Sequence, residues 1–474
     1  MYFAIPVFFV ALVIEVSIQI YKVKYKNEKS DHDFNDTICS ILLGSLQETF
    51  HFFIKPLFYI PYLYVWSNFR IYNISTDSWA SFIIGFLGID FSIYCFHRMG
   101  HEFNIFWAIH VAHHSSEFYN FSSAIRQGMF QYLSPWLHYL PMAFFVHPIH
   151  YSFHHHWNRI LQFWLHTKLF DFECRWMEYI FITPRLHMVH HAKNPQYIDK
   201  NYGGILIIWD RLFGTYKKDE EGVEMEFGIT EEVNTFSTIF LNFHHFIQMY
   251  NISKRLKGLH KLKVIYKAPD WTPEKEYLES ELNPKELNNN NNNNNSKNIL
   301  IEKKITDRKK ESINDTFSIV MCGYLLLEST NISMLLSTLE TFKFEFTDAD
   351  IYKVGAVLIL QIVFVGSILS KNNSSPITII KKYESNYVPK KLKVSFFEIY
   401  PSLSIIQMLR LFVTIVFFYQ ISVSTITPKI YVFFNFLFKF TVAQMFSWII
   451  AIFFSFHKNI VVNSEIPKLN YKKQ

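Results

Sequence analysis

Apolar residues gather into long blocks along this chain, with short polar segments between them. Several blocks approach or exceed the roughly 20 residues that a transmembrane helix needs. A further apolar stretch, 129–150, is interrupted by three prolines and predicts a re-entrant or half-depth helical hairpin rather than two crossings. The pattern therefore predicts an all-α, polytopic membrane protein, with candidate spans at 2–21, 37–66, 78–96, 315–339, 351–370, 403–426 and 430–456.

Charged residues between the blocks orient the predicted spans. Lysines cluster at 22–29, 381–393 and 468–473, whereas acidic residues lie between 340 and 350. Cytoplasmic loops of membrane proteins are enriched in Lys and Arg. We therefore expect the lysine clusters on the cytosolic side, and this topology returns the third span to the cytosol just before His97.

The same pattern divides the chain into four parts. The first block has no basic segment before it and no small-residue cleavage site, so we expect residues 1–35 to remain as a membrane anchor. Residues 36–286 form a histidine-rich membrane domain, and 287–314 form a disordered linker that contains eight consecutive Asn. Residues 315–474 form a C-terminal block of about four membrane helices.

Composition narrows the class of protein further. Hydrophobic residues make up 50% of the chain and aromatic residues 18%, which few soluble proteins contain. The net charge of +6 comes from lysines that flank apolar blocks, so it indicates no nucleic-acid partner. The four cysteines contain no C-x-x-C pair, so neither a disulfide framework nor a thiolate zinc site is indicated.

Eight of the 21 histidines form three tight groups. Spacings of three and four residues bring side chains onto one face of a helix, so each group can direct its imidazoles at one point. The groups are His97 and His101, then His110, His113 and His114, and then His187, His190 and His191.

These histidines indicate a metal centre. Neutral imidazole binds Fe, Zn, Cu or Ni, and one ion accepts roughly four to six donors, so eight convergent histidines imply two ions. All-nitrogen ligation suits zinc as well as iron, but a structural zinc site closes with about four ligands. The surplus of ligands therefore favours redox-active iron. His166 is either a ninth ligand or a buried polar contact, and we expect no metal at His154.

We call these three clusters of closely spaced histidines the histidine boxes. Their order, and their position after a predicted membrane span, resemble those of the fatty acid hydroxylase/sterol desaturase superfamily. Within it the wider sequence is similar to the alkylglycerol monooxygenases. The resemblance extends from about residue 36 to residue 271, and loosely over the C-terminal helices as a hydrophobic profile. It rests on the runs 90–102, 107–117, 162–167 and 199–215.

The resemblance implies a multi-pass enzyme of the endoplasmic reticulum membrane with its active site facing the cytosol. Such an enzyme uses two iron ions, tetrahydrobiopterin and O2 to hydroxylate the ether-linked carbon of 1-O-alkylglycerol lipids. The hemiacetal product then breaks down to a fatty aldehyde and a glycerol derivative. The essential histidines of the family fall on the eight box positions, and its essential acid falls on Glu102.

We also consider the roles of Glu102, of Asp90 and of the glycines at 203 and 204. Glu102 directly follows a ligand histidine, so its carboxylate either holds an imidazole N–H or binds the pterin, or it is a solvated residue at a helix end. Asp90 lies inside an apolar span, where a charge is costly, and we expect it to support the site. The glycines of the 201–204 run are best explained by a tight turn.

Two alternatives remain open from the sequence. The first keeps the fold and metals but acts on a sterol or fatty-acyl chain with electrons from cytochrome b5. The second is a histidine-rich metal-binding or zinc-transport membrane protein. Transport predicts histidines inside the spans, whereas these boxes follow a span. The sequence does not indicate an oligomeric state.

Overall fold

The computed structural model describes residues 4–72, 75–133, 138–170, 176–276 and 348–371, with the single positions 328, 332, 335 and 336. This part of the chain is helical. Its β-structure consists of two isolated bridges, Phe181 with Leu206 and Ala192 with Phe227. The all-α prediction is thus confirmed there. The predicted linker and the spans at 403–426 and 430–456 lie outside the described residues, as does most of the span at 315–339.

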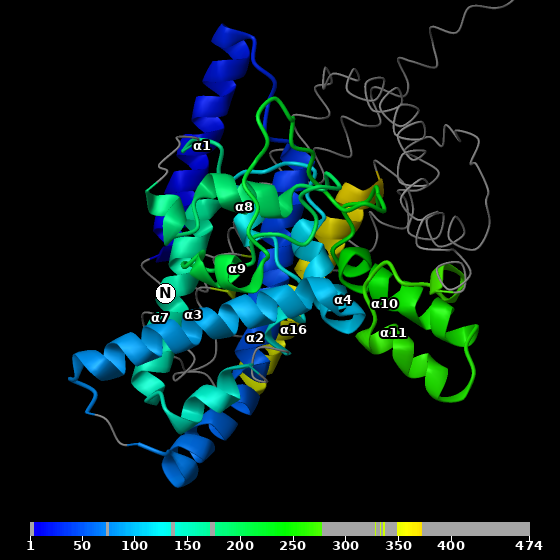
Figure 1. Cartoon of the computed structure of the whole chain (residues 1–474). Coiled ribbons are helices and arrows are strands. Elements are labelled where there is room, and N and C mark those ends of the chain that lie inside the picture. Colours follow the sequence, from blue (N-terminus) through cyan, green and yellow to red (C-terminus); the bar gives the residue numbers. More distant parts are fainter. Residues whose placement is uncertain are drawn as a thin grey trace, which may run out of the picture. The chain divides into compact units, whose positions relative to one another are not determined.

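The described residues up to Asp270 and those from Ile332 onward belong to one compact unit, shown in Figure 1. Within it α3 packs along α4 and α7, and α2 contacts α5, α7 and α16. The helices are α1 (Ala4–Lys26), α2 (Phe34–Phe69), α3 (Trp79–Glu102), α4 (Asn104–His114), α5 (Phe121–Ile125), η1 (Gln131–Leu133), η2 (Leu140–Phe144), α7 (Pro148–Leu165), η3 (Met177–Tyr179), α8 (Pro184–His191), α9 (Ile208–Phe213), α10 (Thr238–Lys254), η4 (Gly258–Leu262), α11 (Lys263–Tyr266) and α16 (Asp348–Lys371).

Side-chain caps determine where several of these helices begin. The side chains of Asp33, Ser78 and Thr183 accept hydrogen bonds from the first-turn amides of α2, α3 and α8. These amides have no partner within the helix, so each cap stabilises the start of its helix. Pro148 and Pro184 open α7 and α8, where a missing N–H costs nothing.

Two helices in the described part are long and apolar enough to cross a membrane. They are the Phe34–Ile54 portion of α2 and the whole of α3, and they agree with the predicted spans at 37–66 and 78–96. The apolar segment Ile351–Gly366 of α16 is shorter. Long core helices of soluble proteins share these properties, so the topology stays a prediction.

The predicted re-entrant hairpin is described only in part, without residues 134–137, and stays a prediction. Its described residues make η1, η2 and the first turn of α7. Proline lacks the N–H that an α-helix needs and collides with the preceding turn, so the prolines here favour short 3-10 segments. The segment is held against α2, where the Tyr62 hydroxyl donates to the Val146 carbonyl at 2.8 Å.

The predicted N-terminal anchor, α1, is part of the compact unit. Its residues Ala11 and Leu12 pack against Phe121 and Phe163. Glu15 is buried in the middle of the helix, accepts from the Phe121 amide at 2.7 Å and also accepts from the Thr167 hydroxyl. A buried carboxylate needs such donors, so α1 is tied to the segments that surround the histidines.

A buried ion pair joins α2 to the segment after α5. The guanidinium of Arg126 donates to the Asp36 carboxylate at 2.8 Å and to the Ser115 and Ser40 hydroxyls at 3.0 and 3.2 Å. Arg126 is 1% exposed, so its charge depends on these partners. Removing one partner of a buried pair leaves an uncompensated charge.

We expect Asp36→Ala to lower the free energy of unfolding by about 3 kcal/mol because Arg126 would lose its counter-charge. Thermal unfolding of the purified protein in detergent should show a clear drop in Tm. The matched control, Glu221→Ala, removes an exposed carboxylate and should leave the Tm unchanged. Equal Tm values for the two variants would contradict the role assigned to the ion pair.

Candidate metal centre

The three histidine boxes lie on three helices whose ends meet. His97 and His101 occupy the last two turns of α3, which ends at Glu102. Phe103 has an extended backbone, so the chain turns there and α4 packs back against α3. The second box closes α4, and the third closes the short helix α8.

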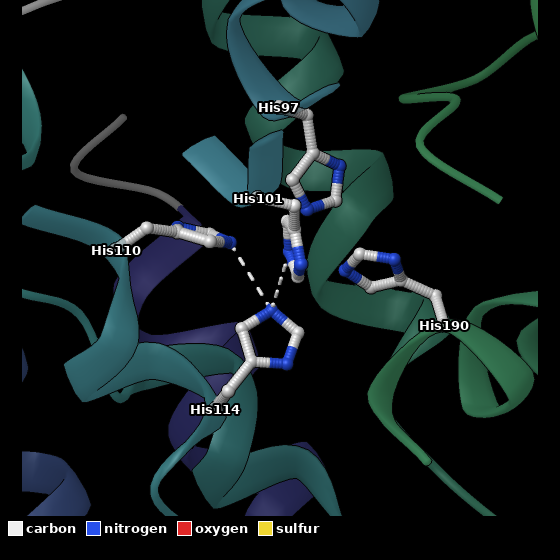
Figure 2. A group of neighbouring side chains, drawn as sticks. All are labelled: His97, His101, His110, His114 and His190. Atoms are coloured by element: carbon white, nitrogen blue, oxygen red, sulfur yellow. Dashed lines mark hydrogen bonds between the residues drawn. The ribbon is translucent and has the colours of Figure 1, made fainter. Parts of the chain in front are cut away.

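Nine buried or nearly buried imidazoles form two groups. Within each group the ligand atoms all lie within 4.8 Å of one another. The groups adjoin, since the His114 and His191 ring centroids are 4.4 Å apart. The first group is shown in Figure 2 and contains His97, His101, His110, His114 and His190; the second contains His113, His166, His187 and His191.

Both groups draw on more than one box, and His166 joins the second group. His166 follows α7, and its Nε2 lies 3.1 Å from Nε2 of His187 and 3.2 Å from Nε2 of His191. Of the two hypotheses for this residue, the geometry therefore supports the ninth ligand. His154 belongs to neither group; it packs against Phe82 and Gly85.

Distances between ring nitrogens match those expected around a bound ion. Nε2 of His114 lies 3.1 Å from Nε2 of both His101 and His110, as Figure 2 shows. A metal–nitrogen bond of about 2.1 Å with angles between 90° and the tetrahedral value places two ligand nitrogens about 3.0–3.4 Å apart. The imidazoles are thus spaced as ligands of a common ion are.

Hydrogen bonds to backbone carbonyls determine which nitrogen of several rings carries the proton. A carbonyl can only accept, so Nδ1 must donate and Nε2 keeps its lone pair. The four rings held this way are His97 to the Tyr202 carbonyl at 3.0 Å, His113 to Arg126 at 2.7 Å, His166 to Gln162 at 2.9 Å and His190 to Lys200 at 2.8 Å.

These tautomers point the lone pairs of the rings toward one another. Nε2 of His113 and Nε2 of His166 are 3.4 Å apart, and neither carries a proton that could bond the other. Nε2 of His190 is buried and has no hydrogen-bond partner among the described residues. Two facing lone pairs repel unless a cation lies between them, so the residues present fit a bound metal ion.

Burial keeps the rings neutral, as metal ligands must be. It lowers the pKa of His166 from its ordinary 6.5 to about 4. The pKa values of His110, His113, His187 and His190 are also lowered far below the ordinary value, first by burial and then by the neighbouring imidazoles. Protons therefore compete weakly for these nitrogens at neutral pH.

Two buried carboxylates hold the turn that orients His97. Asp210 accepts from the amides of Tyr202 and Gly203 at 2.7 and 2.8 Å. Asp90 accepts from the Ile205 amide at 2.9 Å and from three further donors, the Leu206 amide, Asn158 Nδ2 and Trp209 Nε1. Asp90 therefore holds the backbone that follows Gly204, and its support of the site stays a prediction.

The glycines of this turn are needed for close packing. A Cβ on Gly203 would lie 2.6 Å from the Leu206 carbonyl, and one on Gly204 would lie 2.9 Å from Asn158 Oδ1. No ordinary Cβ contact is that short. This agrees with the tight turn expected from the sequence.

Two acidic residues, Glu102 and Asp199, lie near His101. Glu102 is partly exposed and pairs with Arg98 at 2.7 Å, and a hold on an imidazole N–H, one of the three roles considered for it, is absent from its described contacts. Instead Asp199, which the sequence analysis did not single out, lies 3.6 Å from Nδ1 of His101. Its backbone φ of 59° is rare outside glycine, asparagine and aspartate.

Comparison with known proteins agrees with this geometry. The fatty acid hydroxylase family model matches residues 82–215. The chain is 41% identical over 245 residues to the alkylglycerol monooxygenase of Homo sapiens, which covers 52% of this chain and 54% of that protein. Identity to the alkylglycerol monooxygenase of Caenorhabditis elegans is 37% over 249 residues, covering 50% and 49%.

A more distant relative is the ornithine lipid hydroxylase of Rhizobium tropici, at 28% identity over 168 residues, covering 33% of this chain and 49% of that protein. No solved structure matches the chain. The chain spans about half the length of the curated relatives it matches. Residues 82–215, which match the fatty acid hydroxylase family model, thus contain all nine clustered histidines, and the matched half of the chain is similar to the alkylglycerol monooxygenases.

Proposed function

We propose that this chain is a tetrahydrobiopterin-dependent monooxygenase of 1-O-alkylglycerol lipids. The observation that carries the proposal is the pair of adjoining imidazole groups, within a segment that is about 40% identical to alkylglycerol monooxygenases. Relatives that share the segment include an ornithine lipid hydroxylase, so lipid substrates are common to these proteins.

The two groups are suited to two iron ions. Five imidazoles would hold one ion and four would hold the other, which would leave room for further ligands in a six-coordinate shell. Such a pair of ions, with O2 and the reduced pterin, supplies the oxidising chemistry that breaks a C–H bond. The protein supplies ligand orientation through the carbonyl hydrogen bonds described above.

Aromatic rings surround the imidazoles and keep water away. The rings of Trp107 and Tyr202 lie 5.1 and 5.4 Å from His101, and the ring of Tyr119 lies 5.4 Å from His191. The Tyr119 hydroxyl donates to the Leu165 carbonyl at 2.8 Å, so this ring is fixed in place. Excluding water protects a reactive centre from side reactions.

The proposed reaction inserts one oxygen atom of O2 into a C–H bond of the ether-linked carbon. The pterin provides the two electrons that reduce the other oxygen atom. The resulting hemiacetal transfers its hydroxyl proton to the ether oxygen as the C–O bond breaks. The products are a fatty aldehyde and a glycerol derivative.

The enzyme would act on lipid from within a membrane, which we propose to be that of the endoplasmic reticulum, with the site on the cytosolic face. One side of α7 supports contact with lipid. It presents the exposed apolar residues Ile149, Phe153, Trp157 and Leu161 at intervals of four. Such a row favours a hydrocarbon environment.

Glu102 remains our proposed pterin-binding and catalytic carboxylate. Its side chain is 39% exposed at the end of α3, one residue from His101, so a ligand can reach it. A carboxylate suits the amino-pyrimidine edge of a pterin because it accepts two parallel hydrogen bonds. The Arg98 guanidinium fixes its orientation.

We expect purified protein to contain about two iron atoms per chain, one for each imidazole group. His114→Ala and His166→Ala each remove one ligand, from the first and the second group respectively, and should lower the iron content and abolish activity. Metal analysis and an activity assay measure both effects. His154→Ala is the control and should keep both. Full activity with zinc as the only bound metal would refute the di-iron proposal.

We expect membranes that contain the chain to release fatty aldehyde from a 1-O-alkylglycerol only when tetrahydrobiopterin is added. Glu102→Gln keeps the side-chain size but removes the charge, so activity should fall at least about tenfold while iron is retained. Aldehyde release driven instead by NAD(P)H and cytochrome b5, or oxidation of a sterol or fatty acid in its place, would favour the alternative function.

The lowered pKa of His166 predicts that the folded protein loses stability at acidic pH. The unfolded chain takes up protons below pH 6.5, whereas His166 stays neutral in the folded protein until about pH 4. Stability should therefore fall as the pH falls through this range, by roughly 3 kcal/mol from His166 alone. Tm measured against pH tests this. His166→Gln should flatten the profile, and His260→Gln, at an exposed position, should not.

A further inference from the structure

A second polar cluster lies between α2 and α7, outside both imidazole groups. The Arg159 guanidinium of α7 donates to the Glu48 carboxylate of α2 at 2.6 Å. The Tyr132 hydroxyl lies 3.1 Å from the same oxygen of Glu48. The His51 ring stacks on the Tyr132 ring at 3.6 Å. The three elements α2, η1 and α7 thus each contribute a polar group.

The location makes this cluster unusual. Glu48 lies within the part of α2 that is apolar and long enough to cross a membrane. Charges at such positions are costly and are generally functional. The pair is also open: the Glu48 side chain is 30% exposed and the Arg159 side chain 25%. Both charged side chains are therefore partly accessible from outside the protein.

The cluster is adjacent to the imidazole groups along the chain and in space. Gln131 precedes Tyr132 in η1, and its Oε1 lies 3.4 Å from Nδ1 of His110. Arg159 and Gln162 of α7 and His166, which caps the C-terminal end of this helix, follow one another at spacings of three and four residues. His166 lies seven positions after Arg159, which corresponds to a helical rise of about 10 Å.

The chemistry of the cluster fits an uncharged head with several hydroxyl groups. Carboxylate oxygens accept from hydroxyls, while the guanidinium and the phenol donate to them. The two charges cancel, so a phosphate would gain little attraction and would be repelled by Glu48. An uncharged diol needs no net positive charge for its binding and is not repelled by Glu48.

We propose that Glu48, Arg159 and Tyr132 form the subsite that binds the glycerol hydroxyls of the lipid; this rests on the function proposed above. The ether-linked carbon is only a few bonds from these hydroxyls. Holding the head here positions that carbon beside the histidines and selects free glycerol ethers over their phosphorylated forms.

The test compares two substrates with the same alkyl chain: 1-O-hexadecylglycerol and 2-hexadecyloxyethanol, which lacks the hydroxymethyl group. Tyr132→Phe and Glu48→Gln in the full chain should raise the KM for the glycerol ether about tenfold, because the first removes a hydroxyl that can bond the diol and the second removes the negative charge that strengthens the acceptor. The KM for the shorter alcohol should change much less. Glu220→Gln, which breaks a surface ion pair of the same length, is the control.

Binding of radiolabelled 1-O-hexadecylglycerol to the purified iron-loaded protein provides a readout that does not need turnover. If the wild type binds this lipid more tightly than the variants but releases no aldehyde, the subsite stands and the proposed function fails. Tyr132→Phe retains the ion pair between Glu48 and Arg159. If Glu48→Gln does not fold, the KM and the lipid binding of Tyr132→Phe test the subsite. An equal loss for both substrates, or a rise in the KM for tetrahydrobiopterin alone, overturns the proposal.

Discussion

The structure depends on keeping nine imidazoles neutral and directed at one another inside the protein. Lone pairs placed this close repel in the absence of an ion, so the rings would rotate or bond to one another if nothing held them. The carbonyls of Tyr202, Arg126, Gln162 and Lys200 prevent this because each accepts from Nδ1 and leaves Nε2 free. The imidazoles are thus oriented as metal ligands would be, without an ion to hold them.

Three of these carbonyls belong to segments outside regular helices, which need support of their own. Buried carboxylates provide much of it. Asp210 binds the amides of Tyr202 and Gly203, and Asp36 binds the guanidinium of Arg126. Each of these carboxylates fixes the position of a backbone segment. The carbonyl of that segment in turn fixes the orientation of an imidazole, so a carboxylate that does not contact the imidazoles still determines where the lone pair of a histidine points.

The sequence was sufficient to find the eight box histidines because helical spacing of three and four is visible in a single chain. His166 was left open, since its place depends on how α7 meets α8. The supporting carbonyls could not be predicted at all, because every residue has one. The sequence leaves three roles open for Glu102, and its ion pair with Arg98, four residues earlier, is of a kind that forms along a helix.

Helix α7 explains how an apolar substrate and a polar centre can meet. Its outer side presents Ile149, Phe153, Trp157 and Leu161, whereas another face carries Arg159, Gln162 and, at its end, His166. A helix with this division can contact hydrocarbon on one side while its polar side chains face the interior. Since the polar row leads from the Glu48–Arg159 ion pair to an imidazole of the second group, the polar head and the reacting carbon of the proposed lipid substrate can be held along the same helix.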